Sequence, residues 1–166
     1  MARWRSITRN NSFSEFCILN NHGITIDIVL RVKKAFNVVL ATSLVHYFPP
    51  KHHICALGII DEVLTLDPDN VPCLMGRAYI LEASERWDDA AKLFEKVAQT
   101  LPEDVGDVLR AKEEQAWCQL QVHESDTAIS GLKLVLEVLE GSEDRDEDKA
   151  RCLWRIGKCY WEAGGE

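Results

Sequence analysis

The chain lacks the cysteine spacing that marks zinc sites and disulfide-stapled domains. None of its six cysteines forms a C-x-x-C pair, and we expect no secretory signal. A disulfide framework needs an oxidising compartment, so we expect free thiols that pack as small buried hydrophobes. The cysteines are Cys17, Cys55, Cys73, Cys118, Cys152 and Cys159.

Motifs for catalysis and for membrane insertion are also missing. The sequence has no glycine-rich phosphate loop, no G-x-S-x-G and no H-E-x-x-H. The apolar run at residues 35–48 has 14 positions, whereas a membrane span needs about 20. We therefore expect neither an enzyme nor a cofactor, and no membrane span.

A metal site is a weak alternative in one segment. His52, His53 and Cys55 lie close together and could bind a metal with His46. No second ligand pair at zinc spacing accompanies them. We favour the interpretation that they form a turn and the first exposed residues of a helix, and predict no metal.

Positive charge is scarce over most of the chain. Residues 1–50 carry six basic and two acidic side chains (+4), and residues 51–166 carry 13 and 25 (−12), which gives −8 in total. Nonspecific binding to phosphate backbones depends on Lys and Arg. The balance favours protein partners and at most indirect contact with RNA.

Two stretches of the chain superpose at a spacing of 34 residues. Self-similarity at this period is typical of helix–turn–helix solenoids, which stack into protein-binding surfaces. We therefore predict an all-α fold, an α-solenoid of about three helix–turn–helix repeats followed by an unpaired first helix. The matched positions are Ala56, Ile60, Val63 and Pro68, then Ala90, Phe94, Val97 and Pro102.

The second unit, residues 71–104, carries the fullest pattern. Ala78 and Ala90 are small, so two antiparallel helices can approach closely, and larger apolar side chains fill the space beside them. Pro102 cannot continue a helix and ends the unit. These positions resemble the tetratricopeptide pattern. They are Leu74, Ala78, Leu81, Ala90, Phe94 and Pro102.

The other units match less completely. The first, residues 37–70, has a second helix at about 54–66 and a Val- and Thr-rich first helix at about 37–48. The third, 105–140, carries four extra residues, and the acidic stretch 140–148 reads as a solvated loop. The fourth, 149–166, is a first helix whose apolar face lacks its partner helix. The pattern positions are Ala56, Pro68, Ala128, Leu132, Leu153, Ile156, Gly157 and Tyr160.

The unpaired helix and the first 36 residues each have several explanations. The helix points to a piece of a longer array, an incomplete gene product, or a face that a partner protein covers. Arg3, Arg5 and Arg9 faintly resemble a mitochondrial presequence. We favour a disordered tail or a wrongly predicted first exon for residues 1–36.

First helices line the concave face of a tetratricopeptide array, which gives candidate binding residues. Met75 and Tyr79 stand where carboxylate-clamping members of the family carry Lys and Asn, so that activity is not predicted. On the last helix, Trp and Arg are frequent interface hot spots. The alternatives are packing against a further helix, and stacking on RNA bases. The candidates are Met75, Tyr79, Arg151, Trp154, Arg155, Lys158 and Trp161.

Three segments, residues 64–97, 110–118 and 144–166, resemble the tetratricopeptide scaffold subunits of fungal superkiller complexes. The resemblance implies a scaffold without catalytic residues in a cytoplasmic complex, and leaves a nuclear location open. It implies a helicase and a β-propeller subunit as partners, which thread RNA into the exosome for 3′-to-5′ mRNA decay. The alternative is a generic tetratricopeptide adaptor that binds a peptide in its concave groove.

Overall fold

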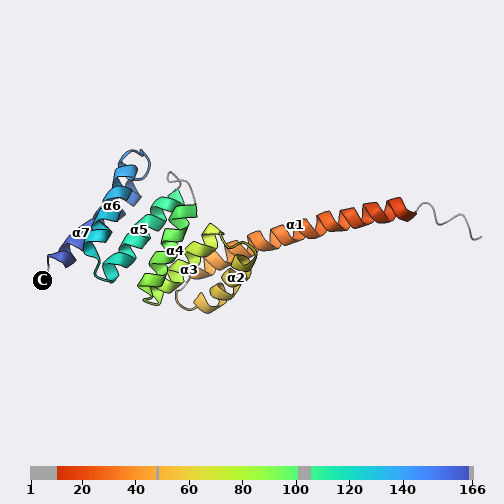
Figure 1. Ribbon diagram of the computed structural model, residues 1–166, viewed down its shortest axis with the longest axis horizontal. Helices are drawn as coiled ribbons and strands as arrows, with labels where there is room; N and C mark the ends of the chain where they lie inside the picture. The colour runs from red at the N-terminus through yellow and green to blue at the C-terminus, as the bar shows by residue number, and fades with distance from the viewer. Residues whose placement is uncertain (1–10, 48, 101–105, 165–166) are drawn as a thin grey trace, which may run out of the picture. The chain divides into compact units, whose positions relative to one another are not determined.

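The computed structural model describes residues 11–47, 49–100 and 106–164, with side chains from residue 27 onward. These ranges contain helices and turns and no strand (Figure 1). The predicted all-α helical-repeat solenoid is thereby confirmed. The helices are α1 Asn11–His46, α2 His53–Leu66, α3 Val71–Ala83, α4 Trp87–Thr100, α5 Gly106–Gln121, α6 Ser125–Glu140 and α7 Asp146–Ala163.

The first helix is much longer than the sequence predicted. The chain divides into two compact units, Met1–Asn37 and Val38–Glu166, and α1 runs through the boundary. Residues 11–36 are helical, whereas a disordered or wrongly predicted segment was expected. Val and Ile lose rotamer freedom in a helix without breaking it, and no proline precedes Pro49. Residues 1–10 lie outside the described part of the chain.

The second compact unit, Val38–Glu166, begins with the last turns of α1. Residues 38–46 of these turns pack against α2. Ala41 and Val45 share a core with Ala56 and Ile60. A Cβ on Gly76 of α3 would lie 3.4 Å from Ile60 Cδ1 and from Val45 Cγ2. The small residue therefore lets α3 approach both α1 and α2.

The turn between α2 and α3 is held by polar contacts. Asn70 precedes α3 and its side chain accepts a hydrogen bond from the Cys73 amide at 3.3 Å, while Pro72 stands in the first turn of the helix. These are standard helix-start features. Lys96 of α4 donates to the Pro68 carbonyl at 2.9 Å and so ties the same turn to the next helix pair.

Small residues bring α3 and α4 together. Ala78 and Ala90 are fully buried, and Leu74 and Phe94 fill the space around them, while Leu81 packs at the margin. The cluster extends to α5 through Ala111 and Cys118. Pro102, the expected end of this unit, lies outside the described residues.

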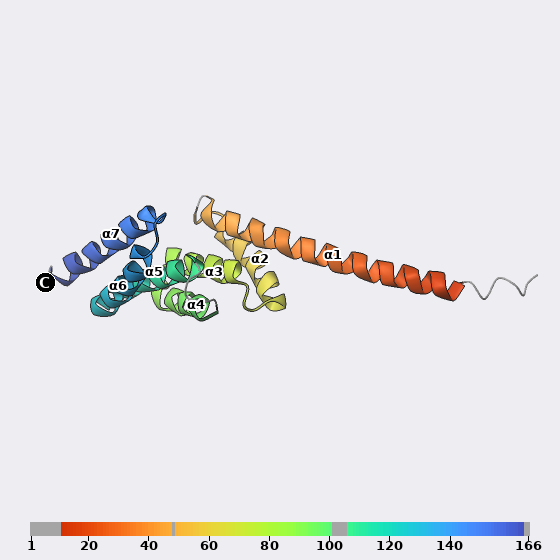
Figure 2. The same ribbon diagram turned by 90° about the horizontal axis from the view of Figure 1, so that it is seen from above.

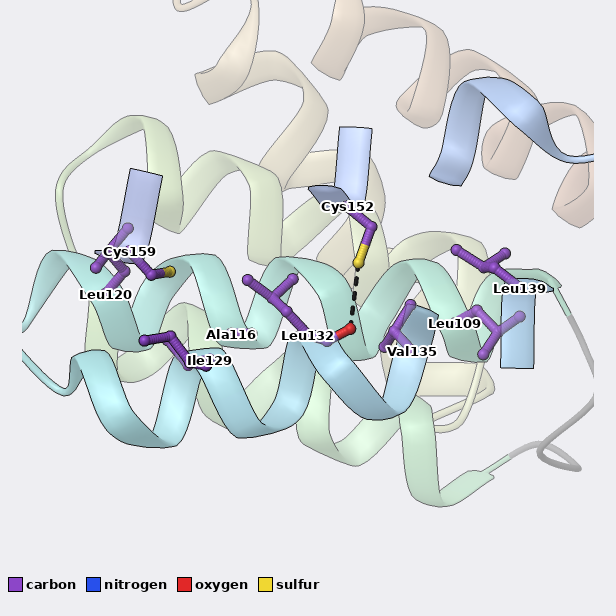
Figure 3. Packing of buried hydrophobic residues seen from close by; sticks show 10 residues of the cluster. Leu109, Ala116, Leu120, Ile129, Leu132, Val135, Leu139, Cys152 and Cys159 are labelled. Carbon is purple, nitrogen blue, oxygen red and sulfur yellow. Dashed lines mark hydrogen bonds between the residues drawn. The ribbon is translucent and has the colours of Figure 1, made fainter. Parts of the chain in front are cut away.

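A third core joins α5, α6 and α7 (Figure 3). Ala128 and Leu132 are fully buried in α6, close to Ala116 of α5. Cys152 of α7 donates its thiol to the Leu132 carbonyl at 3.2 Å. Of the cysteines with described side chains, Cys73, Cys118, Cys152 and Cys159 are buried and Cys55 is exposed; the side chain of Cys17 is outside the described part.

The acidic stretch after α6 is only partly a loop. Helix α6 ends at Glu140 and α7 begins at Asp146. The loop expected at 140–148 is therefore wrong for residues 146–148, which are helical. Asp146, Glu147 and Asp148 occupy the first turn of α7, where negative charge is favoured by the helix dipole.

Successive helices from α2 to α7 pack on one another, and α5 also contacts α7 (Figure 2). One face of α7 remains uncovered by the described residues. Leu153 and Tyr160 are about half exposed, Ile156 is half-buried, and no atom lies within 4 Å of the Cβ position of Gly157. This uncovered face carries the pattern positions of the fourth unit.

Candidate functional site

Two adjacent glutamates of α5 form the centre of a buried ion-pair network. Glu113 and Glu114 are each 1% exposed, and charged carboxylates are buried this far only when they are paired. Arg151 of α7 donates Nε to Glu113 Oε1 at 2.8 Å and Nη2 to Oε2 at 2.9 Å. Arg155 donates Nη2 to Glu114 Oε2 at 2.7 Å. The planar guanidinium fork suits such two-point contacts.

The network also reaches α3 and the start of α7. Arg110 lies with Nη2 2.5 Å from Glu114 Oε1, and its Nε donates to the Tyr79 hydroxyl at 3.3 Å. Burial opposes ionisation of Asp148, but hydrogen bonds from Arg151 and Arg145 hold the pKa of that carboxyl below its usual value. The hydrogen bonds of Glu113 keep the pKa of Arg151 raised. The three first helices α3, α5 and α7 are therefore linked by charge-assisted hydrogen bonds.

Aromatic rings continue the same surface. The Arg155 guanidinium carbon lies 5.2 Å from the Trp117 ring centroid, within reach of a cation–π contact. The rings of Trp117 and Trp154 have centroids 5.8 Å apart. Trp161 is 79% exposed, the most open of these aromatic side chains.

The structure gives the predicted groove residues different surroundings. Arg151 and Arg155 are engaged by glutamates, and Arg155 is buried. Lys158 pairs with Glu162 at 2.9 Å on the surface. Met75 packs beside the α3–α4 core, and the Tyr79 ring meets the rings of His46 and Phe94 edge-on. Whether any of these side chains binds a partner stays a prediction.

The sequence reasoning missed the acidic half of this network. Counting 41 residues back from Arg151, Trp154, Arg155 and Lys158 gives the matching positions of the third unit. The same first-helix positions, marked on α5, would have shown that glutamates of α5 match arginines of α7. These positions are Arg110, Glu113, Glu114 and Trp117.

A hollow of about 390 Å³ opens beside Tyr79, between the end of α3 and neighbouring helices. Glu82 stands in its wall, and burial, with the negative charge of Glu114, raises the pKa of the Glu82 carboxyl to about 7. The remaining lining includes His46, His53, Trp87 and Arg110.

The buried thiols of Cys118 and Cys152 are poor nucleophiles. Burial raises the pKa of the Cys118 thiol to about 12 and of the Cys152 thiol to about 11, and nearby glutamates act in the same direction. The thiolate is the nucleophile. At neutral pH these cysteines therefore stay protonated and serve as packing groups.

The histidines considered as possible metal ligands contact other groups in the structure. His53 Nε2 lies 3.2 Å from the Val45 carbonyl, and the His52 ring stacks on Tyr47. Across the described ranges, no group of three or more His, Cys, Asp or Glu side chains could hold a metal ion. No helix within those ranges is both long and apolar enough to cross a membrane.

Comparison with known proteins gives relatives but no family model: none matches the chain. The chain is 31% identical to superkiller protein 3 of Saccharomyces cerevisiae over 129 residues, 77% of this chain. It is 25% identical to superkiller protein 3 of Schizosaccharomyces pombe over 135 residues, 81% of this chain. It is also 31% identical, over 86 residues, to an uncharacterized protein, y4yS, of Sinorhizobium fredii, matching 52% of this chain and 41% of that protein.

The chain spans 9% of the length of each superkiller protein 3. The resemblance seen in the sequence and the observed helix pairs agree. The chain is homologous to a segment of superkiller protein 3 and has the architecture of a tetratricopeptide-like helical repeat.

Proposed function

We propose that the chain is a non-enzymatic scaffold of a superkiller-type complex, which supports exosome-mediated 3′-to-5′ decay of cytoplasmic mRNA. The observation that carries the proposal is the 31% identity to superkiller protein 3 over 129 residues. Helical repeats of this kind act through extended binding surfaces. The buried, protonated thiols and the internally paired charges are compatible with such a role.

The proposed partners are a helicase subunit and a β-propeller subunit, and the proposed location is the cytoplasm. RNA contact is indirect in this proposal, because the arginines of α7 already pair with the glutamates of α5. Lys and Arg that are neutralised internally release few counterions from a nucleic acid.

The proposed contact surface is the exposed side of α7. Trp154 and Trp161 supply large apolar area, with Lys158 beside them, and Trp is enriched among interface hot spots. Arg151 and Arg155 serve this surface by holding α7 against α5. Met75 and Tyr79 belong to α3, where both pack against the α3–α4 core. Tyr79 also accepts a hydrogen bond from Arg110 of α5.

Affinity purification of the tagged full chain from its own cells tests the scaffold proposal. The helicase and β-propeller subunits should co-purify, and Trp161→Ala should reduce their recovery. Leu134→Ala is the control, because Leu134 is also exposed but belongs to α6. Absence of both subunits with a soluble wild-type chain would overturn the proposal.

A generic adaptor that binds a peptide is the second candidate. It is favoured by the hollow beside Tyr79, which could hold a peptide side chain. Co-purification of an unrelated protein, with neither superkiller subunit present, would favour this candidate over the first.

A further inference from the structure

The hollow beside Tyr79 is built from both aromatic and charged side chains. Rings of Tyr79, Trp87 and His46 form parts of its wall, and the Glu82 carboxylate stands among them. Its volume of about 390 Å³ is in the range of small binding sites. A long side chain can therefore enter it.

Glu82 differs from the carboxylates of the ion-pair network, because no arginine or lysine of the described residues forms an ion pair with it. Glu113, Glu114 and Asp148 each form ion pairs with arginines. Within the described ranges, Glu82 has no ion pair at 4 Å or closer. Arg110 also lines the hollow, but its guanidinium is already held by Glu114 and the Tyr79 hydroxyl. The positive charges of Arg155 and Arg110 act on Glu82 from a distance, but neither arginine donates a hydrogen bond or forms an ion pair with it in the described residues.

Anionic, apolar and cationic groups would interact differently with the Glu82 carboxylate. An anionic group would be repelled by Glu82. An apolar side chain would bury the carboxylate further without giving it a hydrogen bond, which is costly. A guanidinium or ammonium group gains a charge-assisted hydrogen bond with Glu82, and the wall also contains aromatic rings, which attract cations.

We propose that this hollow receives a cationic side chain, arginine or lysine, from a partner protein, with Glu82 as its counter-charge. The inference rests on the proposed scaffold function and names the chemistry of one contact within it. Acidic C-terminal segments, which basic clamps recognise, do not fit this site.

The site should respond to pH in a defined direction. The Glu82 carboxyl has a pKa of about 7, above its ordinary value of 4.5, because of burial first and Glu114 second, against the opposing charges of Arg155 and Arg110. As the pH rises through about 7, Glu82 ionises and a cation binds more tightly. Tyr79, His46 and His53 also face the hollow, and the Glu82→Gln variant keeps all three.

The test uses the purified full chain with small probes. N-acetyl-arginine amide and N-acetyl-lysine amide are titrated while NMR follows the Glu82 carboxyl carbon and the Trp87 indole. N-acetyl-citrulline amide is the neutral isostere of the arginine probe. We expect the arginine or lysine probe to shift both signals, and to bind about tenfold more weakly to Glu82→Gln.

Glu95→Gln is the matched control variant, because it makes the same change on an exposed site of α4. It should leave binding of the cationic probes unchanged. Equal binding of citrulline and arginine probes would overturn the proposal, and so would equal binding to wild type and Glu82→Gln. Because no cellular partner is needed, a negative result here is separate from the outcome of the affinity purification.

Discussion

At the scale of single residues, we expect the buried contact between Glu113 and Arg151 to contribute most to the stability of the ion-pair network. Removing the carboxylate takes from Arg151 its two-point buried partner and leaves it only the contact with Asp148, while Arg155 keeps Glu114. Breaking such a pair typically costs about 3–5 kcal/mol, and partial exposure of Arg151 lowers this figure. We expect Glu113→Ala to lower the free energy of unfolding by about 3 kcal/mol in urea denaturation.

The exposed pair Lys158–Glu162 provides the comparison for this prediction. Both side chains are well exposed, and such pairs contribute about 0–1 kcal/mol. Glu162→Ala should therefore change the unfolding free energy little. If Glu113→Ala costs no more than Glu162→Ala, the network does not stabilise the packing of α7 on α5.

Glu82 makes a second prediction at this scale, in the pH dependence of stability. Its pKa in the folded chain is about 7, against an ordinary value of 4.5. The folded state therefore binds the proton more tightly, and the stability that this supplies is full below pH 4.5. It is lost as the pH rises through about 7.

Glu82→Gln cannot lose this proton, so its stability should fall less over the same pH range. After discounting for solvent screening, the variant should gain about 1 kcal/mol on wild type above pH 7. Thermal unfolding at a series of pH values measures the difference. Glu95→Gln should follow the wild-type curve, and a Glu82→Gln curve parallel to wild type would contradict the prediction.

At the scale of elements, apolar patterning predicted the helices and polar pairing escaped it. Ala56 and Ala90 recur at the repeat spacing because each lets two adjacent helices approach, so the sequence carries the packing directly. Glu114 and Arg155 lie 41 positions apart, and neither has a distinctive local context. Their pairing becomes visible only when the repeat register of α7 is carried back onto α5, a step that apolar patterning alone does not include.

The start of α1 escaped prediction for another reason. The unusual composition of residues 1–36 favoured a disordered tail or a wrongly predicted exon, whereas each residue of low helix propensity costs only a fraction of a kcal/mol. Without a proline before Pro49, no residue forces the helix to end. Expected helix bounds elsewhere differ little, as for α2, which begins at His53 instead of Ile54.

Two glycines within helices give an element-scale prediction. A Cβ added at Gly157 of α7 or Gly58 of α2 would meet no atom within 4 Å. Alanine is favoured over glycine in helix interiors by about 1 kcal/mol. We expect Gly157→Ala and Gly58→Ala each to raise the free energy of unfolding by about that amount in urea denaturation.

Gly76→Ala is the contrasting variant, because its Cβ would lie 3.4 Å from both Ile60 and Val45. Its gain in propensity is offset by crowding, so it should stabilise less than the other two. Equal gains at Gly157 and Gly76 would show that α3 has room against α1 and α2 that the packing does not indicate.

At the scale of the whole molecule, each compact unit displays large apolar side chains to solvent. In the described part of the first unit they are Ile28, Val29, Leu30, Val32 and Phe36, and on α7 they are Leu153, Trp154, Tyr160 and Trp161. Contiguous exposed apolar surface marks interaction sites and drives association. The purified chain should therefore self-associate as its concentration rises, which sedimentation velocity measures.

Lysine substitutions on either unit should weaken this association. Burying one large apolar side chain contributes about 1.5–3 kcal/mol, so the pair Leu153→Lys and Tyr160→Lys should lower the association constant at least about tenfold. The pair Val32→Lys and Phe36→Lys tests the first unit in the same way. Gln99→Lys and Glu95→Gln together add two units of positive charge on exposed positions of α4 and should have little effect. A wild-type chain that stays monomeric at every concentration would contradict this prediction.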